Sequence, residues 1–128
     1  MLGINPEEVR LIIQKAHQFH AKEGVVIPDD SDSHSDDWAM QVLADHASDP
    51  SYQELKYEID SLDPEQQASL VALMWVGRGD YAADEWDGAL QDAKGSWNRR
   101  TADYLIRTPL VADYLQEGLS ELGYYEED

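Results

Sequence analysis

The chain contains no cysteine, few lysines and no long hydrophobic run. Without cysteine, disulfide bonds, thiolate metal sites and cysteine nucleophiles are excluded, and no oxidising compartment is needed. The longest strongly apolar stretch, Leu70 to Val76, is far shorter than the ~20 residues of a transmembrane helix. The N-terminus has no basic segment followed by an apolar one, so we expect no secretory signal. These absences predict a cytoplasmic protein that does not enter the membrane.

Charge of one sign dominates what is present. The 128 residues include 27 Asp and Glu against 9 Lys and Arg, which gives a formal net charge of −18. Such a field repels nucleic-acid phosphates and anionic membrane surfaces. It is compatible with a basic protein partner, with cations, with a high-salt habitat or with solubility alone. Because 42% of the residues are hydrophobic, one core can form, and we predict a single domain over residues 1–128.

Four of the five prolines follow a residue type that caps helices: Asn5-Pro6, Asp49-Pro50, Asp63-Pro64 and Thr108-Pro109. Asn, Asp and Thr side chains accept hydrogen bonds from the free amides of a first helical turn, and a proline placed there loses no bond. Glu8 and Gln66 each stand three residues after a cap, which predicts capping boxes. The sequence therefore predicts that helices begin at these four prolines.

The first half of the chain has the apolar spacing of amphipathic helices. From Pro6 to about Lys22 and from Pro50 onward, one face carries Val9, Ile12, Ile13, Ala16 and Phe19, then Tyr52, Leu55, Ile59 and Leu62. Another helix, capped by Ser35 or Asp36, is expected to end near His46. The segment from Pro64 is apolar on nearly all sides, as is typical of a helix inside a bundle. We predict an all-α bundle of five to six helices with a central helix over about 64–77, ended by Gly77.

In the second half, helical spacing resumes near Ala82 after a turn over residues 77–80. This spacing predicts one continuous apolar stripe of about six helical turns, formed by Trp86, Leu90, Ala93, Trp97, Thr101, Tyr104 and Leu105. Glycine weakens a helix, so a break near Gly95-Ser96 is left open. The last predicted helix begins at Pro109 and ends at Gly123, with an apolar face of Val111, Leu115, Gly118, Leu119 and Leu122. Residues 124–128 form a frayed acidic tail.

Two groups of residues have side chains of the types that bind metal ions. The acidic loop over about 28–36 places Asp30, Asp32, His34 and Asp36 on alternate residues, but Ser35 stands where a calcium loop requires glycine. His17 and His20 are three residues apart, without an HExxH pattern or a third ligand. We therefore expect a solvated loop, exposed histidines, no metal site and no cofactor.

Two C-terminal motifs are distinctive: ALMWVGRGD over 72–80, followed by Trp86-Asp87, and NRRTADYLIRTPLVADYLQEG over 98–118. With Ile4-Asn5-Pro6-Glu7, Ser35-Asp36-Asp37 and the Asp63 region, they resemble a bacterial family catalogued as domain of unknown function thirty-seven seventy-five. The resemblance covers nearly the whole chain. It implies an all-α fold, and it implies no activity, ligand or catalytic residue.

The sequence contains no catalytic signature, so the functional prediction is coarse. We expect a non-enzymatic interaction module that meets a basic protein partner through its acidic surface, with no nucleic acid or membrane as partner. A second predicted surface is a polar groove, with residues drawn from Arg78, Asp80, Trp86, Asn98, Arg99, Thr101 and Tyr104. The alternative is a small-molecule or enzymatic site lined by Arg78, Asp80, Asn98 and Arg99. The tryptophans are expected to be core anchors, and one left partly exposed beside Arg99 and Arg100 would indicate a recognition surface.

Overall fold

Three of the predicted helix starts carry the predicted caps in the computed structural model, which describes residues 3–21, 48–108 and 110–124. Side-chain oxygens of Asn5, Asp49 and Asp63 accept hydrogen bonds from the first turns of their helices. Asp63 and Gln66 form the predicted capping box, with bonds of 2.8 and 3.1 Å. The described helices are α1 (Pro6–His20), α3 (Pro50–Asp60), α4 (Pro64–Arg78), η1 (Ala83–Glu85, a 3₁₀ turn), α5 (Trp86–Ser96), α6 (Thr101–Arg107) and α7 (Val111–Glu121).

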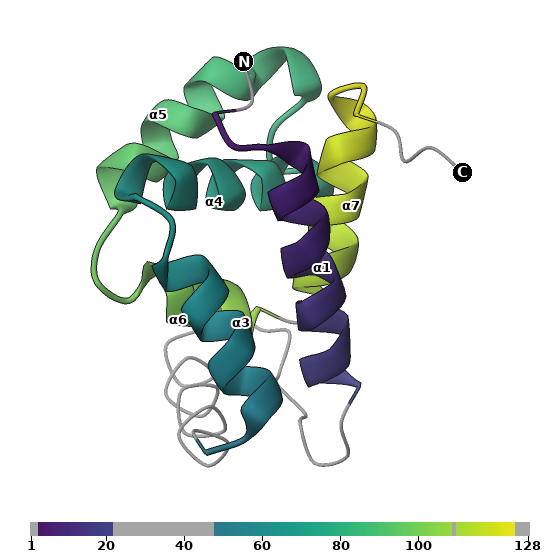
Figure 1. Cartoon of the computed structure of the whole chain (residues 1–128). Helices are drawn as coiled ribbons and strands as arrows, with labels where there is room; N and C mark the ends of the chain where they lie inside the picture. Colours follow the sequence, from purple (N-terminus) through teal and green to yellow (C-terminus); the bar gives the residue numbers. More distant parts are fainter. Residues whose placement is uncertain (1–2, 22–47, 109, 125–128) are drawn as a thin grey trace, which may run out of the picture.

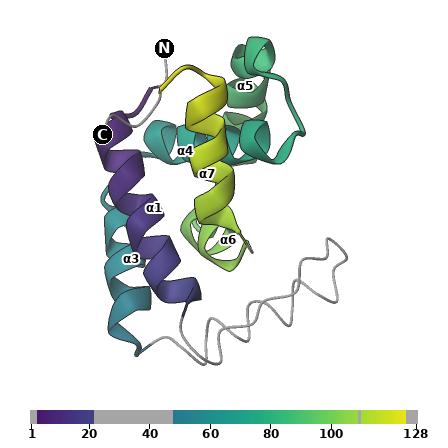
Figure 2. The ribbon, with the colours of Figure 1, turned by 90° about the vertical axis from the view of Figure 1, so that its right-hand side faces the viewer.

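The described part of the chain is all-helical, and α4 lies at its centre (Figure 1). α4 packs against α5 on one side and crosses α7 on the other, while α1 contacts both α7 and α3. Figure 2 shows α1 and α3 side by side, with α6 below α4. A hydrogen bond of 3.0 Å from Tyr52 Oη to Asp103 Oδ1 joins α3 to α6. The prediction of an all-α bundle with a central helix over about 64–77 is confirmed.

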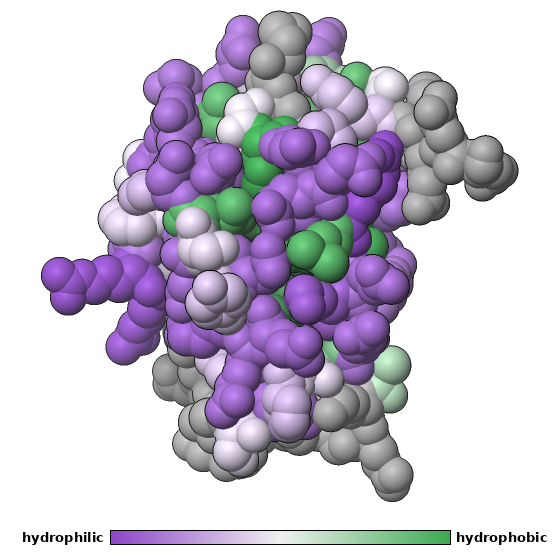
Figure 3. All heavy atoms as spheres, viewed as in Figure 1, coloured by the Kyte–Doolittle hydropathy of each residue, from purple (hydrophilic) through white to green (hydrophobic). Residues whose placement is uncertain are grey.

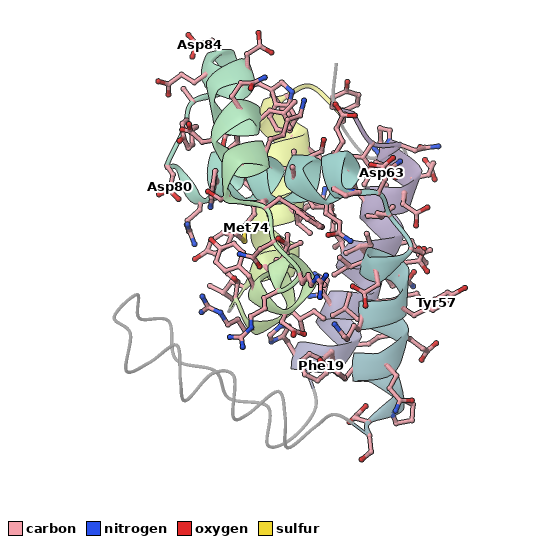
Figure 4. All side chains as sticks on the ribbon, turned by 90° about the vertical axis from the view of Figure 1, so that its left-hand side faces the viewer. Phe19, Tyr57, Asp63, Met74, Asp80 and Asp84 are labelled. Carbon is pink, nitrogen blue, oxygen red and sulfur yellow. The ribbon has the colours of Figure 1, made fainter. Side chains whose placement is uncertain are left out.

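The core consists of the apolar faces that the sequence spacing predicts. The predicted inner residues of α1 and α3 are all buried, and α4 buries residues on nearly all sides. Met74, labelled in Figure 4, is 0% exposed and lies where α4 meets the other helices. Burial of a side chain of this kind contributes about 1.5–3 kcal/mol relative to an exposed position. The fold therefore depends on hydrophobic burial around α4.

The glycine that ends α4 is Gly79 and not the predicted Gly77, two residues earlier. The helix ends at Arg78, and Gly79 provides the left-handed cap with φ 94°. The Asp80 amide donates to the Trp75 carbonyl at 2.9 Å, which closes the last turn. Gly77 remains helical because it packs against the backbone of α7.

The single stripe predicted from Trp86 to Leu105 is also wrong, because two helices share it. α5 ends at Ser96, and residues 97–100 separate it from α6. Trp97 turns out of the stripe and donates its indole N–H to the buried Gln67 at 2.8 Å. The break falls next to Gly95-Ser96, where the sequence left it open.

Thr108 does not cap the last helix. Its hydroxyl donates to the Tyr104 carbonyl at 2.7 Å, so it closes α6, and Pro109 lies outside the described residues. α7 begins at Val111, after Leu110 with φ 62°. Gly123 follows its end with φ 91°, as expected of a helix terminus.

Glu8 does not complete a capping box at the start of α1. Asn5 accepts from the Glu7 amide at 2.9 Å, whereas the Glu8 side chain lies against Glu58 of α3. The other predictions for residues 22–47, which include Gly24, the acidic loop over 28–36 and a helix ending near His46, and those for residues 125–128, lie outside the described residues. Within residues 3–21, 48–108 and 110–124, no helix combines the length and hydropathy that a membrane span requires.

Candidate functional site

The seven residues predicted to line a groove lie in three different places. Trp86 belongs to the core, where it is 8% exposed. Arg78, Asp80 and Tyr104 meet beside the end of α4, and Asn98, Arg99 and Thr101 lie in or next to the 97–100 loop between α5 and α6. Trp86 is therefore an anchor of α5 and lines no surface groove.

The first cluster surrounds Trp75, so we call it the Trp75 corner; its other members are Arg78, Asp80, Tyr81 and Tyr104. Arg78 Nε and Nη2 both bind Asp80 Oδ2, at 2.8 and 2.7 Å. The Trp75 indole N–H donates to Tyr104 Oη at 3.1 Å. The Tyr81 ring stacks on Trp75, with centroids 5.8 Å apart. The last turn of α4 thus brings a tryptophan, an arginine and two tyrosines together.

Electrostatics fix the charge of this corner. Partial burial lowers the pKa of Arg78, but the hydrogen bonds with Asp80 and Tyr104 outweigh that effect and raise the pKa above its usual value. The guanidinium is therefore permanently charged, and Asp80 already neutralises it. A hydrogen bond from the Tyr81 hydroxyl to Asp92 raises the pKa of Tyr81. Trp75 remains partly exposed beside Arg78.

The second cluster is the 97–100 loop. The Asn98 amide donates to Thr101 Oγ1 at 3.0 Å, and Asn98 Oδ1 accepts from the Arg100 amide at 2.7 Å. These two bonds form the turn into α6. The roles of Asn98 and Thr101 are thus local and structural, while the side chains of Arg99 and Arg100 are left in solvent.

The two clusters do not merge into the predicted pocket of Arg78, Asp80, Asn98 and Arg99. Lys94 Nζ lies 3.0 Å from Glu65 Oε1, and Trp97 binds Gln67, so the end of α5 lies over the first turns of α4. Arg78 and Asp80 lie at the other end of that helix, as the positions of Asp63 and Asp80 in Figure 4 show. Among the described residues, the partners of Arg78 and those of Asn98 have no member in common. The reason is that α5 runs back along α4, so the residues that follow α5 lie at the start of α4 and Arg78 lies at its end.

The two histidines of α1 are directed to different partners. His20 Nε2 donates to the Ile106 carbonyl at 2.9 Å and so caps the C-terminal turn of α6. Burial lowers the pKa of His20, and the bond to Ile106 opposes this shift. His17 Nε2 lies 3.8 Å from Asp113 Oδ1 on α7. Across the described ranges, no three His, Asp or Glu side chains are grouped as metal ligands would be.

Two hollows are present that sequence reasoning did not find. A cavity of about 10 Å³ lies among apolar side chains between α1, α3, α4, α6 and α7. A shallow depression of about 580 Å³ lies between α1 and α7 and is lined by Glu7, Arg10, Leu11, Ile13, Gln14, His17 and Gln116. The sequence indicated this depression only through Leu11, an apolar residue outside the buried stripe of α1 that is 39% exposed.

Among the described residues, the strongest charged feature is the acidic stretch over residues 80–92. It contains Asp80, Asp84, Glu85, Asp87 and Asp92, all exposed, and no Lys or Arg. It connects the Trp75 corner to the first turns of α5. Asp84 projects away from the helices at this end of the molecule (Figure 4). Most of the face seen in Figure 3 is hydrophilic, with small apolar patches between polar side chains.

A comparison with protein families shows to which family the chain is related. The model of one family, described as a protein of unknown function (DUF3775), matches residues 52–124. The chain belongs to this family. The DUF3775 match runs from α3 to the residues after α7 and contains the Trp75 corner, the acidic stretch and the 97–100 loop. The resemblance noted at Ile4-Asn5-Pro6-Glu7 and Ser35-Asp36-Asp37 lies outside it. No curated protein and no solved structure matches the chain.

Proposed function

We propose that this DUF3775 protein is a non-enzymatic interaction module that binds a basic protein partner through the acidic stretch over residues 80–92. The observation that carries the proposal is the exposure of five carboxylates in 13 consecutive residues without a single base. Asp84 and Asp87 have no hydrogen-bond or ion-pair partner among the described residues, so both are available to a ligand. The net charge of −18 acts in the same direction.

The acidic surface affects both the rate at which a basic partner is met and the contacts that hold it. A strongly acidic surface attracts a basic protein over about a Debye length, ~8 Å at physiological ionic strength, and speeds association. Specificity then depends on a few anchor residues that pack closely against the partner, and aromatic side chains are common among them. The partly exposed Trp75–Tyr81 stack lies directly beside the acidic stretch and can supply apolar and cation–π contacts to lysine or arginine side chains.

The test is affinity capture by the tagged protein from its native cell at low and high salt. We expect a discrete basic protein that is retained at low salt and released as the salt concentration rises. The variant Asp84→Asn/Asp87→Asn should retain it roughly 3- to 10-fold less well, because two unpartnered carboxylates of the proposed surface are removed.

The matched control is Glu117→Gln/Glu121→Gln, which makes the same change in net charge on exposed positions of α7. If both variants lose retention equally, overall charge rather than this surface attracts the partner, and the assignment to 80–92 is wrong. If no basic protein is retained at low salt, the proposal of an interaction module is wrong. A thermal-shift screen with metal ions and nucleotides addresses the enzymatic alternative, and a reproducible shift there would favour a small-molecule site.

A further inference from the structure

The 97–100 loop contains the two basic side chains of the described chain that have no partner. Of the eight described Lys and Arg residues, five form ion pairs with carboxylates: Arg10, Lys15, Lys56, Arg78 and Lys94. Arg107 lies over the Tyr104 ring at 5.1 Å from its centroid. The side chains of Arg99 and Arg100 make no hydrogen bond, ion pair or ring contact with any described residue. In a protein with three times as many acids as bases, two adjacent unpaired arginines require an explanation.

The backbone that carries these arginines is fixed. Asn98 bonds the amide of Arg100 through its side chain, and its own amide is held by Thr101, which is 6% exposed. The Thr101 amide in turn donates to the Asn98 carbonyl at 3.1 Å. A turn closed by three hydrogen bonds loses little further entropy when a ligand binds. Both arginines are therefore presented from a preorganised loop.

A tryptophan is fixed beside them. Trp97 is 37% exposed, yet its indole N–H donates to Gln67 Oε1 at 2.8 Å, and Gln67 is only 7% exposed. The Gln67 amide donates to the carbonyls of Ile59 and Leu62, at 2.9 and 3.3 Å. The buried glutamine thus sets the orientation of the indole and leaves part of it in solvent. A rigid aromatic residue next to arginines is the composition of an interface hot spot.

The 97–100 loop is also exposed to solvent. It forms the left-hand rim in Figure 1, away from α7 and α1. In the same view of Figure 3, hydrophilic side chains project outward at that rim. Residues 93–102 contain no Asp or Glu. No acidic residue next to the loop in the chain therefore competes for the two guanidinium groups.

We propose that Trp97, Arg99 and Arg100 form a docking site for an acidic segment of a protein partner, with carboxylates on the arginines and an apolar side chain on the indole. Guanidinium groups match carboxylates in a two-bond fork, and such charge-assisted bonds are about twice as strong as neutral ones. The site lies at the opposite end of α5 from the acidic stretch and does not depend on the function proposed above.

The charge of the protein indicates which kind of partner binds the 97–100 loop. A nucleic acid carries a dense line of phosphates that the net charge of −18 repels along its whole length. A short acidic segment presents a few carboxylates, and screening beyond ~8 Å leaves the contacts at the loop to decide binding. The indole can stack on a nucleobase as well as pack against an apolar side chain, so the net charge and not the indole argues against a nucleic acid. An acidic polypeptide therefore fits the loop better than a polyphosphate chain.

The test is an NMR titration of the ¹⁵N-labelled full chain with an octapeptide of glutamates around one central phenylalanine. We expect chemical-shift changes confined to the backbone amides of residues 97–101 and to the Trp97 indole N–H. The variant Trp97→Phe lacks this indole signal and so assigns it. The same peptide with glutamine in place of glutamate should not bind. The double variant Arg99→Gln/Arg100→Gln should weaken binding at least tenfold, whereas Arg99→Lys/Arg100→Lys should weaken it by a smaller factor because charge is kept and the fork is lost.

Two control variants and two tests of other occupants make the result decisive. Arg10→Gln/Lys15→Gln removes the same two charges on α1 and should leave peptide affinity within twofold, and Asp84→Asn/Asp87→Asn should not weaken it. Unchanged affinity in Arg99→Gln/Arg100→Gln, or shifts spread over the surface, would overturn the proposal. Tighter binding of an oligothymidylate of eight nucleotides would assign the loop to nucleic acid instead. A salt-sensitive dimer in sedimentation, lost in the same variant, would make a second copy of the chain the occupant and would likewise overturn it.

Discussion

Gly77 of α4 lies directly against the carbonyl oxygen of Tyr114 in α7. A Cβ atom built on Gly77 would overlap that oxygen, and one built on Gly118 would overlap the carbonyl oxygen of Leu73. The two glycines therefore face the opposite helix at one crossing point and let the two backbones touch. Because α7 crosses the central helix here, this contact fixes how the second half of the bundle packs.

We expect Gly77→Ala and Gly118→Ala each to destabilise the fold by about 1–3 kcal/mol, since the obstructing atoms belong to the backbone and cannot rotate away. Gly88→Ala and Gly95→Ala in α5 are the controls, because no atom lies within 4 Å of a Cβ at either position. These should stabilise the protein by about 0.5–1 kcal/mol. Urea unfolding followed by circular dichroism measures all four. Equal effects at the two pairs of positions would contradict the close crossing.

Gln67 is the buried link between α3, α4 and the 97–100 loop. Replacing it with methionine preserves volume but leaves the Leu62 carbonyl and the Trp97 indole N–H without their partner. We expect Gln67→Met to cost about 1–2 kcal/mol. The NMR signal of the Trp97 indole should move in the same variant. Gln91→Met, at an exposed position of α5, is the control and should change neither quantity.

Glu8 introduces a pH dependence at the contact of α1 with α3. Its Oε2 atom is shielded from solvent and has no hydrogen-bond partner among the described residues. The side-chain hydrogen bond with Glu58, burial, and repulsion from the Glu58 carboxylate raise the pKa of Glu8 above its ordinary 4.5. The folded protein thus keeps a proton that the unfolded chain releases, and this stabilisation is lost as the pH rises above 4.5.

Glu8→Gln removes the titrating group and keeps a hydrogen-bonding side chain. We expect it to raise the urea midpoint at pH 7 and to flatten the loss of stability between pH 4.5 and 7. The control is Glu117→Gln, which removes an exposed carboxylate of α7. A midpoint that falls at pH 7 in Glu8→Gln would show that the Glu8 carboxylate stabilises the fold, which is the opposite of the expected effect.

His20 makes the protein less stable as the pH falls, which is the opposite of the effect of Glu8. Because burial lowers its pKa below the ordinary 6.5, the unfolded chain binds a proton first as the pH falls, and stability is lost below about pH 6.5. His20→Gln places an amide donor near the Ile106 carbonyl without a titrating ring. We expect that variant to lose less stability between pH 7.5 and 5.5 than the parent. His17→Gln removes a neighbouring charge that also lowers the pKa of His20, so it should reduce the slope less than His20→Gln does.

Local chemistry explains which helix ends were predictable. Asn5, Asp49 and Asp63 bond amides two or three residues ahead, so their role depends on neighbours in the chain. Thr108 has the same capping chemistry, but its hydroxyl instead bonds the Tyr104 carbonyl four residues behind. A hydroxyl next to two helices can close the first or begin the second, and sequence spacing does not distinguish the two.

The candidate surfaces were less predictable, because they are made by contacts distant in sequence. Arg78 and Asp80 were predicted to line the same site, and the two residues that form this ion pair are only two positions apart in the chain. The bond from Trp75 to Tyr104 spans 29 residues, and that from Trp97 to Gln67 spans 30. Both depend on where α5 ends, and the continuous apolar stripe concealed that point.

The amino-acid order alone determined the helical class, the caps at Asn5, Asp49 and Asp63, the apolar faces and the acidic composition, because each follows from residues within a few positions of one another. Tertiary packing decided that Gly77 stays helical, that Trp97 leaves its stripe for Gln67, and that Arg78 and Arg99 lie in separate clusters. The reason is that these outcomes depend on backbone contact and buried hydrogen bonds between helices, and the free energy of such contacts exists only when the partner helix is in place.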